Sequence, residues 1–390
     1  MSLDPSEAHG HSAFRGGHER EHGRHGGRNA TASATRPGSR EDVGVPATPR
    51  LLLDPDALAA NLTAMAEYCT AAGVALRPHV KGHKSPEVAR RQLAAGAVGV
   101  AAATLAEAAA MVDGGVGDVL LTSVLPPARA HDAAALSVRA PRLTLVVADP
   151  AHVDALDAAA ARAGVRLDVL LDLDVGQRRG GVAPGAPALA LAQRVAAAAA
   201  LRLCGVQGYE GHLQAIADPE ERAMRSSAAM GALGVAVDTL RAAGHAVAWV
   251  TTAGTGTATF AAAHPVVTEV QPGSYALMDA AYAGVGGVGF AQAVWVEASV
   301  LAVLSDTEVI VDAGTKALSV DAGPAVVAPP LEATYAPAGD EHGRLTGALA
   351  GLGVGDRVRL VPSHADTTVL LHAALHLPDG TTWPVAARPH

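Results

Sequence analysis

Cysteines, aromatic residues and long apolar segments are all scarce in this sequence. Its 390 residues include two cysteines, Cys69 and Cys204, and aromatic side chains make up only 3% of the chain. Two cysteines exclude a disulfide framework and a four-cysteine zinc site, and they favour a reducing, cytoplasmic compartment. With few aromatic rings, the core has to be filled by small side chains together with leucine and valine.

Charged residues are also sparse, and the acidic ones predominate. Lys and Arg total 29 against 38 Asp and Glu, which gives a formal net charge of −9. This balance argues against general nucleic-acid binding, since that requires cations for the phosphates. The apolar segment 186–203 is interrupted by Gln193, Arg194 and Arg202, so it predicts a soluble helix and not a membrane span. The hydrophobic fraction of 49% is large enough for a sizeable core.

Residues 1–45 differ in composition from the rest of the chain. They are rich in Gly, Arg, Ser and His, with closely spaced imidazoles at His9, His11, His18, His22 and His25. Because no apolar periodicity is present, we predict a disordered, solvated tail. The segment also lacks the apolar region of a secretory signal, which agrees with a cytoplasmic location.

Apolar strand-like segments alternate with alanine-rich helix-like segments over roughly residues 51–270. The expected strands are 76–80, 98–103, 119–123, 143–148, 167–173, 203–207 and 248–252, and the expected helices are 56–72, 85–94, 105–113, 152–163, 187–199 and 219–242. Continuous apolar strands between helices are typical of a parallel sheet. The number of units predicts a (β/α)8 TIM barrel over residues 46–275, with a doubly wound open sheet as the alternative.

The pattern changes after about Pro272, where short strand-like segments are separated by Gly, Asp and Pro. We expect strands at 294–304, 308–312, 357–361 and 369–375, and no long helix between them. This predicts an antiparallel β domain over residues 276–390.

A lysine follows one of the predicted barrel strands. Residues 76–84 read Leu-Arg-Pro-His-Val-Lys-Gly-His-Lys, so Lys81 comes at the carboxyl end of the strand, where barrels place their chemistry. Neighbouring cations and partial burial favour the uncharged form of an amine, which can attack a carbonyl and form a Schiff base. The alternative interpretation is a solvated basic cluster.

Two short polar loops follow the last predicted barrel strands. Residues 253–257 read Ala-Gly-Thr-Gly-Thr and residues 273–275 read Gly-Ser-Tyr. Small residues allow backbone N–H groups to approach a phosphate, and barrels commonly bind phosphate after their last strands. Plain turns remain the alternative for each loop taken alone.

These segments together resemble a known family. Arg77-Pro78-His79-x-Lys81-x-His83-Lys84 is similar to the cofactor motif of the fold-type III D-threonine aldolase and D-serine dehydratase family of pyridoxal 5'-phosphate enzymes. The resemblance runs from about Thr48 to Arg388. It implies an alanine-racemase-like barrel followed by a β domain, with the cofactor bound covalently to Lys81.

The resemblance also implies the other cofactor contacts. His79, Tyr209 and Arg179 (in 174–179, Asp-Val-Gly-Gln-Arg-Arg) are expected near the ring. A guanidinium is always protonated and would keep the ring nitrogen unprotonated. The expected phosphate contacts are Gly254, Thr255, Gly256, Thr257, Gly273, Ser274 and Tyr275. Ala253 stands where the family commonly has glycine.

A His-x-Asp pair, His364 and Asp366, lies in the predicted β domain. If this segment is a strand, residues i and i+2 point the same way and can share one divalent cation, such as Mn²⁺, Mg²⁺ or Zn²⁺. Aldolase members of the family resembled carry His-x-Asp here, whereas dehydratase members typically carry His-x-Cys.

The resemblance therefore implies a homodimeric, metal-dependent carbon–carbon lyase. It would cleave D-β-hydroxy-amino acids, as in the conversion of D-threonine to glycine and acetaldehyde. The alternatives are a D-serine or 3-hydroxy-D-aspartate dehydratase, a racemase and a non-catalytic pyridoxal-phosphate carrier. A histidine proposed for acid–base work in the family is replaced by Ala215, so the expected substitute is His83, His212 or His79, or else a metal-bound hydroxide.

Overall fold

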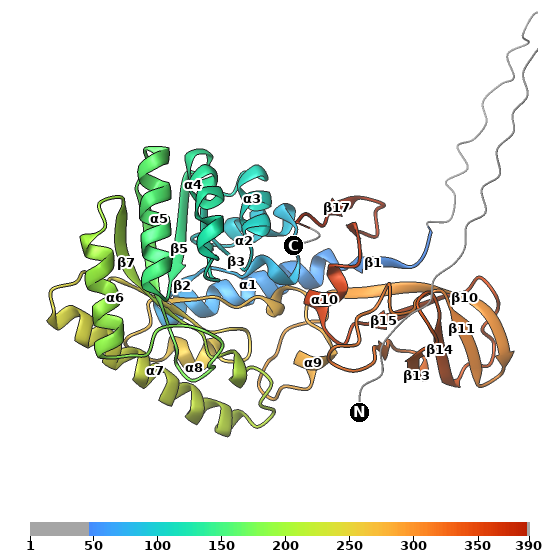
Figure 1. Cartoon of the computed structure of the whole chain (residues 1–390). Helices are drawn as coiled ribbons and strands as arrows, with labels where there is room; N and C mark the ends of the chain where they lie inside the picture. Colours follow the sequence, from blue (N-terminus) through green and yellow to red (C-terminus); the bar gives the residue numbers. More distant parts are fainter. Residues whose placement is uncertain (1–46, 388–390) are drawn as a thin grey trace, which may run out of the picture. The chain divides into compact units, whose positions relative to one another are not determined.

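Two sheets of different construction organise residues 47–387, which the computed structural model describes (Figure 1). The first sheet has eight parallel strands in the order β2-β9-β8-β7-β6-β5-β4-β3. They are β2 (Ala75–Leu76), β3 (Val100–Ala102), β4 (Asp118–Leu121), β5 (Arg142–Val147), β6 (Leu167–Leu173), β7 (Leu201–Gly208), β8 (Trp249–Thr252) and β9 (Glu269–Val270). A parallel bridge between His79 and Ala101 joins the two outer segments, so the sheet curls back on itself as a barrel. The barrel prediction is confirmed.

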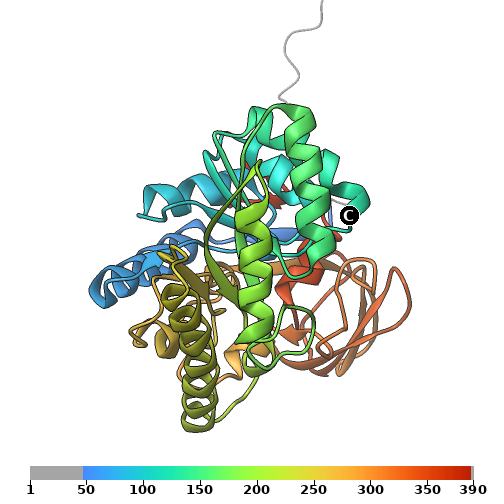
Figure 2. The same ribbon diagram turned by 60° about the vertical axis from the view of Figure 1, so that its left-hand side comes forward.

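The barrel strands are buried along nearly their whole length, as expected for a parallel sheet covered on its outer face. The covering helices are α1 (Pro55–Ala72), α2 (Pro86–Ala94), α3 (Leu105–Asp113), α4 (Ala130–Arg139), α5 (Pro150–Ala163), α6 (Ala186–Ala197), α7 (Pro219–Ala242) and α8 (Ala258–Ala262). Figure 2 shows the green to olive helices lying outside the strands. In residues 47–387 no helix is long and apolar enough to cross a membrane.

Local sequence signals account for where several helices begin. Asp54, Asp149 and Asp218 each accept backbone N–H groups of the following turn, and a proline opens each of these helices. Thr104 and Glu107 form a reciprocal capping box at the start of α3. Helices α3 and α7 therefore have the predicted bounds, whereas α4 was not predicted.

The second sheet has nine largely antiparallel strands in the order β11-β14-β13-β12-β15-β10-β1-β16-β17. They are β1 (Arg50–Leu53), β10 (Val294–Ser305), β11 (Glu308–Val311), β12 (Val326–Val327), β13 (Glu332–Pro337), β14 (Gly343–Ala348), β15 (Arg357–Val361), β16 (Ala374–His376) and β17 (Thr382–Pro384). Strand β1, which precedes the barrel in sequence, pairs antiparallel with β10 and parallel with β16. The sheet is thus built from both ends of the described chain.

Short helical turns connect these elements near the barrel mouth. They are η1 (Val80–Gly82), η2 (Pro127–Arg129), η3 (Gly211–Leu213), η4 (Ser274–Ala276), α9 (Ala280–Ala283) and α10 (Ala365–Val369).

Two expected strands differ from the structure. The strand predicted at 76–80 ends at Leu76, because Pro78 has no N–H for the ladder and the chain then turns into η1. The strand predicted at 369–375 was wrong: α10 occupies 365–369 and only 374–376 is extended. The predicted tail, residues 1–45, lies outside the described residues.

Candidate active site

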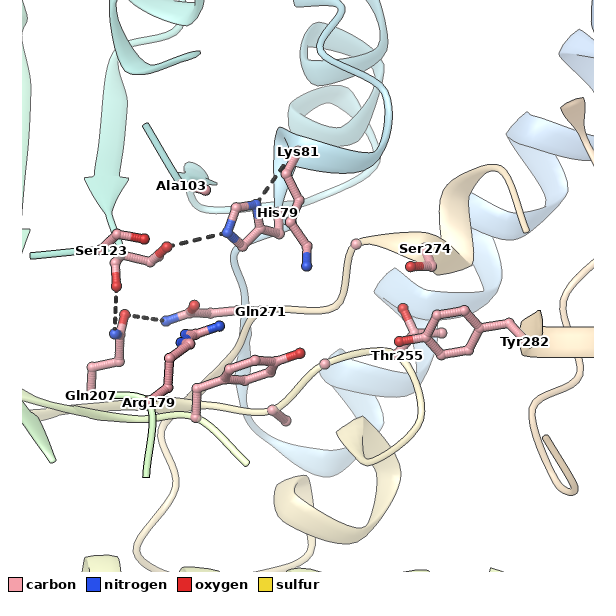
Figure 3. A pocket seen from close by; sticks show the side chains of 15 residues that line it. His79, Lys81, Ala103, Ser123, Arg179, Gln207, Thr255, Gln271, Ser274 and Tyr282 are labelled. Carbon is pink, nitrogen blue, oxygen red and sulfur yellow. Dashed lines mark hydrogen bonds between the residues drawn. The ribbon is translucent and has the colours of Figure 1, made fainter. Parts of the chain in front are cut away.

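A cleft opens at the carboxyl ends of the barrel strands (Figure 3). The lining comes mainly from the segments that follow β2, β3, β4, β6, β7, β8 and β9. It consists of His79, Lys81, Ala103, Thr122, Ser123, Arg179, Gln207, Tyr209, Ala253, Gly254, Thr255, Gln271, Gly273, Ser274 and Tyr282.

Lys81 lies in the η1 turn, just beyond the strand end where the sequence placed it. Its side chain is 41% exposed and extends into the cleft (Figure 3). The whole sequence contains three lysines, Lys81, Lys84 and Lys316. Lys84 is buried in an ion pair with Glu107, and Lys316 is paired with Glu341 on the surface of the β domain. Lys81 is therefore the amine available to a carbonyl compound in this cleft.

His79 is held in one tautomer beside Lys81. Its Nδ1 accepts the backbone N–H of Lys81 at 3.2 Å, and its Nε2 lies 3.2 Å from the Thr122 hydroxyl. That hydroxyl donates to the carbonyl of Ala102, so it can only accept from His79 Nε2–H. Burial and the nearby Lys81 and Lys84 lower the pKa of His79 well below its usual value. His79 thus presents a neutral ring to the cleft.

The two polar loops meet at one side of the cleft. Gly254, Thr255, Gly273 and Ser274 line it, whereas Gly256, Thr257 and Tyr275 lie behind them. Thr255 Oγ1 accepts the backbone N–H of Tyr275 at 3.0 Å, so its own hydrogen remains available to a bound anion. Among the described residues that line the cleft, none is an Asp or Glu. Hydroxyls, small residues, Lys81 and Arg179 together suit a phosphate-bearing aldehyde.

Arg179 and Tyr209 form the opposite side. The guanidinium of Arg179 lies 5.4 Å from the centre of the Tyr209 ring, within cation–π range. Burial raises the pKa of the Tyr209 hydroxyl, so this hydroxyl stays neutral.

Several lining residues were missed by the sequence analysis. Gln207 and Gln271 bond to each other through Gln271 Nε2 at 3.3 Å, and Gln207 Nε2 also donates to Asp172 at 2.8 Å. Burial raises the pKa of Asp172 to about 6. The glutamines and Thr122 lie at or just after strand ends, so a search for polar residues there would have found them. Tyr282 in α9 carries no comparable signal.

His364 and Asp366 do not lie on a strand, so the i and i+2 geometry of a strand does not apply to them. His364 precedes α10 and Asp366 lies in its first turn, because Pro362 ends β15 and Asp279 caps the N–H of Ala365 at 2.8 Å. The two side chains nevertheless approach each other, with His364 Nε2 3.9 Å from Asp366 Oδ2. Asp366 Oδ2 also lies 3.4 Å from Lys81 Nζ.

One carboxylate oxygen of this pair is free to bind a cation. Asp366 Oδ1 is buried and has no hydrogen-bond partner among the described residues. A Cβ built on Gly82 would approach this oxygen to 3.0 Å, so a side chain there would crowd it. Within residues 47–387 no three His, Cys, Asp or Glu side chains gather closely enough to hold a metal by themselves. Water or substrate would have to complete the coordination of an ion on this pair.

The remaining candidate histidines lie away from the cleft lining. His83 is fully buried, its Nδ1 accepts the N–H of Ser85, and burial lowers its pKa to about 4. His212 is exposed in η3, with its ring against Gly176. The geometry therefore gives His83 a role in holding the Lys81 turn and leaves His212 open to solvent.

Comparison with known proteins agrees with this fold. The family model "Alanine racemase, N-terminal domain" matches residues 53–281, more than half of the chain, and a model of a serine dehydratase domain matches residues 293–377. The crystal structure of D-threonine aldolase from Filomicrobium marinum has a TM-score of 0.83 and 38% sequence identity, covering 88% of this chain and 95% of that one.

Curated relatives cover most of the chain. D-threonine aldolase of Arthrobacter sp. is 37% identical and 3-hydroxy-D-aspartate aldolase of Paracoccus denitrificans (strain Pd 1222) is 36% identical, each over 87% of this chain and 92% of the relative. D-threo-3-hydroxyaspartate dehydratase of Delftia sp. (strain HT23) is 32% identical over 82% of this chain and 91% of the relative.

The barrel, the lysine at its mouth and the second sheet define a pyridoxal-phosphate protein of fold-type III, the alanine-racemase class. Within that class, this chain belongs to the D-threonine aldolase and D-serine dehydratase family.

Proposed function

We propose that the protein is a pyridoxal-phosphate- and divalent-metal-dependent aldolase that cleaves the Cα–Cβ bond of D-β-hydroxy-amino acids, releasing glycine and an aldehyde. One observation carries the proposal: the cleft amine, Lys81 Nζ, lies 3.4 Å from Asp366 of a His-x-Asp pair. An amine for the cofactor and a ligand set for a cation thus occur side by side. D-threonine is the substrate expected from the aldolase relatives.

The proposed cofactor contacts are those of the cleft. Lys81 would hold pyridoxal phosphate covalently, and its phosphate would lie against Gly254, Thr255, Gly273 and Ser274. Bound there, the cofactor supplies the electron sink that stabilises a carbanion at Cα. His79 and Tyr209 would contact the ring, and Arg179 would keep a positive charge beside it.

His364 Nε2 and Asp366 would hold the divalent cation, which lowers the pKa of a hydroxyl that binds it. The chain's own residues must then take up the hydroxyl proton. Both ring nitrogens of His79 are already engaged, whereas Lys81 Nζ lies next to Asp366. Lys81 can therefore hold this proton, and the exposed His212 remains the proposed group for exchange with solvent.

A dehydratase is the alternative, because one relative with this fold carries that name. Dehydration would remove the Cα proton and expel the hydroxyl, yielding ammonia and an oxo acid. The His-x-Asp form favours the aldolase, as the family resemblance implies.

Product analysis separates these functions. We expect D-threonine and D-3-hydroxyaspartate to give glycine and aldehyde in equal amounts, without ammonia, and we expect a chelator to stop the reaction. Ammonia without aldehyde would assign the dehydratase, and racemised substrate without either product would assign a racemase. Cofactor binding without turnover would indicate a non-catalytic pyridoxal-phosphate carrier.

Asp321 orients His364 for the proposed cation. His364 Nδ1 lies 2.7 Å from Asp321 Oδ2, and Thr367 Oγ1 donates to the other oxygen of Asp321 at 2.8 Å. With Nδ1–H donating to Asp321, the Nε2 lone pair faces Asp366.

We expect Asp321→Ala to weaken Mn²⁺ binding roughly tenfold or more while leaving cofactor absorbance unchanged. A Mn²⁺ titration followed by electron paramagnetic resonance measures this. Asp306→Ala removes the same charge from an exposed turn of the β domain and is the control. Equal Mn²⁺ affinity in both variants would contradict the orienting role.

A cytoplasmic homodimer is also part of the proposal. The family resemblance supports the homodimer. The two free cysteines, Cys69 and Cys204, support the cytoplasmic location.

A further inference from the structure

Glu210 is a buried carboxyl group that the proposed mechanism does not use. It follows β7, is fully buried, and forms no ion pair with any Lys, Arg or His of residues 47–387. A buried carboxyl without a cation is costly unless hydrogen bonds satisfy it. The bonds of Glu210 run to two threonines: Thr257 Oγ1 lies 2.6 Å from Oε1, and Thr252 Oγ1 lies 3.1 Å from Oε2.

The Thr257 and Thr252 hydroxyls donate to the two oxygens of Glu210, and the Thr252 hydroxyl also lies within hydrogen-bonding distance of the Gly208 carbonyl. Burial raises the pKa of Glu210, whereas the hydrogen bonds that its carboxyl group accepts lower it. These bonds connect Glu210 to Thr257 at the end of the 253–257 loop and to Thr252 just before it.

Gln214 reaches the same loop from four residues further on. Its side chain is buried, its Oε1 accepts the backbone N–H of Gly256 at 2.8 Å, and its Nε2 donates to Thr257 Oγ1 at 2.7 Å. The Thr257 hydroxyl therefore lies between Glu210 and Gln214 and bonds to both. A Cβ at Gly254 would come within 2.6 Å of Gln214 Oε1, so the loop packs directly on this amide.

These bonds decide which groups of the loop face the cleft. Gly256 N–H and the Thr257 hydroxyl point away from the cleft, toward Gln214 and Glu210. Gly254 and Thr255 therefore form the side of the loop that lines the cleft. The loop begins at Ala253, which is fully buried with φ +67°, a conformation that L-residues rarely adopt. A loop held in such a shape depends on its supports.

We propose that Glu210 and Gln214 are positioning residues that hold the 253–257 loop in the shape that recognises the cofactor's phosphate group. Neither side chain lines the cleft, so both act through the loop. The inference rests on the proposed function, because it needs pyridoxal phosphate as the ligand. It assigns the preference for a phosphorylated cofactor to two residues behind the site.

The test compares the binding of pyridoxal phosphate and of pyridoxal, which lacks the phosphate, to the cofactor-free protein. We expect Gln214→Met and Glu210→Met to lose roughly tenfold or more in affinity for pyridoxal phosphate, with the Kd for pyridoxal changed less than about threefold. Glu210→Gln keeps a hydrogen-bonding group of the same size and is expected to retain the phosphate preference. Thr257→Val, which removes the shared hydroxyl, is expected to resemble Gln214→Met.

Tyr335→Phe provides a matched control, because it removes one buried hydroxyl bond, to Ala313, in the β domain. We expect its ratio of the two Kd values to equal that of the parent protein. A ratio of the two Kd values that stays unchanged in the loop-support variants would overturn the proposal, whether both ligands lose affinity equally or neither loses any. If Glu210→Met does not fold, Gln214→Met and Thr257→Val decide. A parent protein that binds neither ligand would instead refute the proposed function.

Discussion

Replacing Lys81 by alanine is expected to abolish the absorbance of the lysine-bound cofactor and to lower aldol cleavage by at least about 10³-fold. The reason is the lysine inventory of this chain. Lys84 is buried against Glu107, and Lys316 is paired on the surface of the β domain, so neither can replace Lys81 in the cleft. The measurement is the visible spectrum of the purified variant in the presence of added pyridoxal phosphate.

Peptide mapping makes this prediction sharper. Borohydride reduction of the parent protein should fix the cofactor on the peptide that contains Lys81, and mass spectrometry would locate it. Lys316→Ala removes an exposed lysine and is expected to keep both the spectrum and the activity. A cofactor band that persists in Lys81→Ala, or that maps to Lys84 or Lys316, would remove Lys81 from its proposed role.

Asp366→Ala is expected to lower cleavage of D-threonine by at least about 10²-fold while the cofactor stays bound. A cation on His364 and Asp366 would stabilise the developing alkoxide by several kcal/mol, and each 1.36 kcal/mol corresponds to a factor of ten in rate. Removing one of the two protein ligands removes most of that effect. The measurements are kcat with added Mn²⁺, the metal content of the variant, and its cofactor spectrum.

The spectrum separates metal loss from cofactor loss. Because Asp366 also lies 3.4 Å from Lys81 Nζ, a variant that lost the cofactor band would indicate that Asp366 mainly holds the lysine. Asp306→Ala, with the same change in charge on an exposed turn, is expected to behave as the parent protein. Unchanged turnover in Asp366→Ala would show that the metal assignment is wrong.

Local sequence patterns predicted much of the barrel, because its signals are local. Strand β6 and helices α3 and α7 have the predicted bounds, since continuous apolar segments, capping residues and prolines act within a few residues. Prediction failed for the strand expected at 369–375. Helix α10 occupies 365–369, where Asp279 from another segment accepts the N–H of Ala365, and only 374–376 is extended.

The same division holds for the candidate site. The motif around Lys81 and each of the two polar loops is a short continuous stretch of sequence. The cleft brings these three stretches together. The sequence could not place Thr257 behind the loop or His83 under the turn, because both positions depend on partners from other segments. Gln207, Gln271 and Tyr282 were missed for the same reason.

The sequence by itself determined most of the barrel strands and helices, the position of Lys81 at a strand end and the family of this protein, since each is written in neighbouring residues. Only the tertiary structure decided that Asp366 lies beside Lys81, that His79 is neutral, and that Glu210 and Gln214 bond to Thr257 of the 253–257 loop. The physical reason is that burial and hydrogen-bond pairing arise when distant segments pack together, and no local periodicity encodes which side chains then meet.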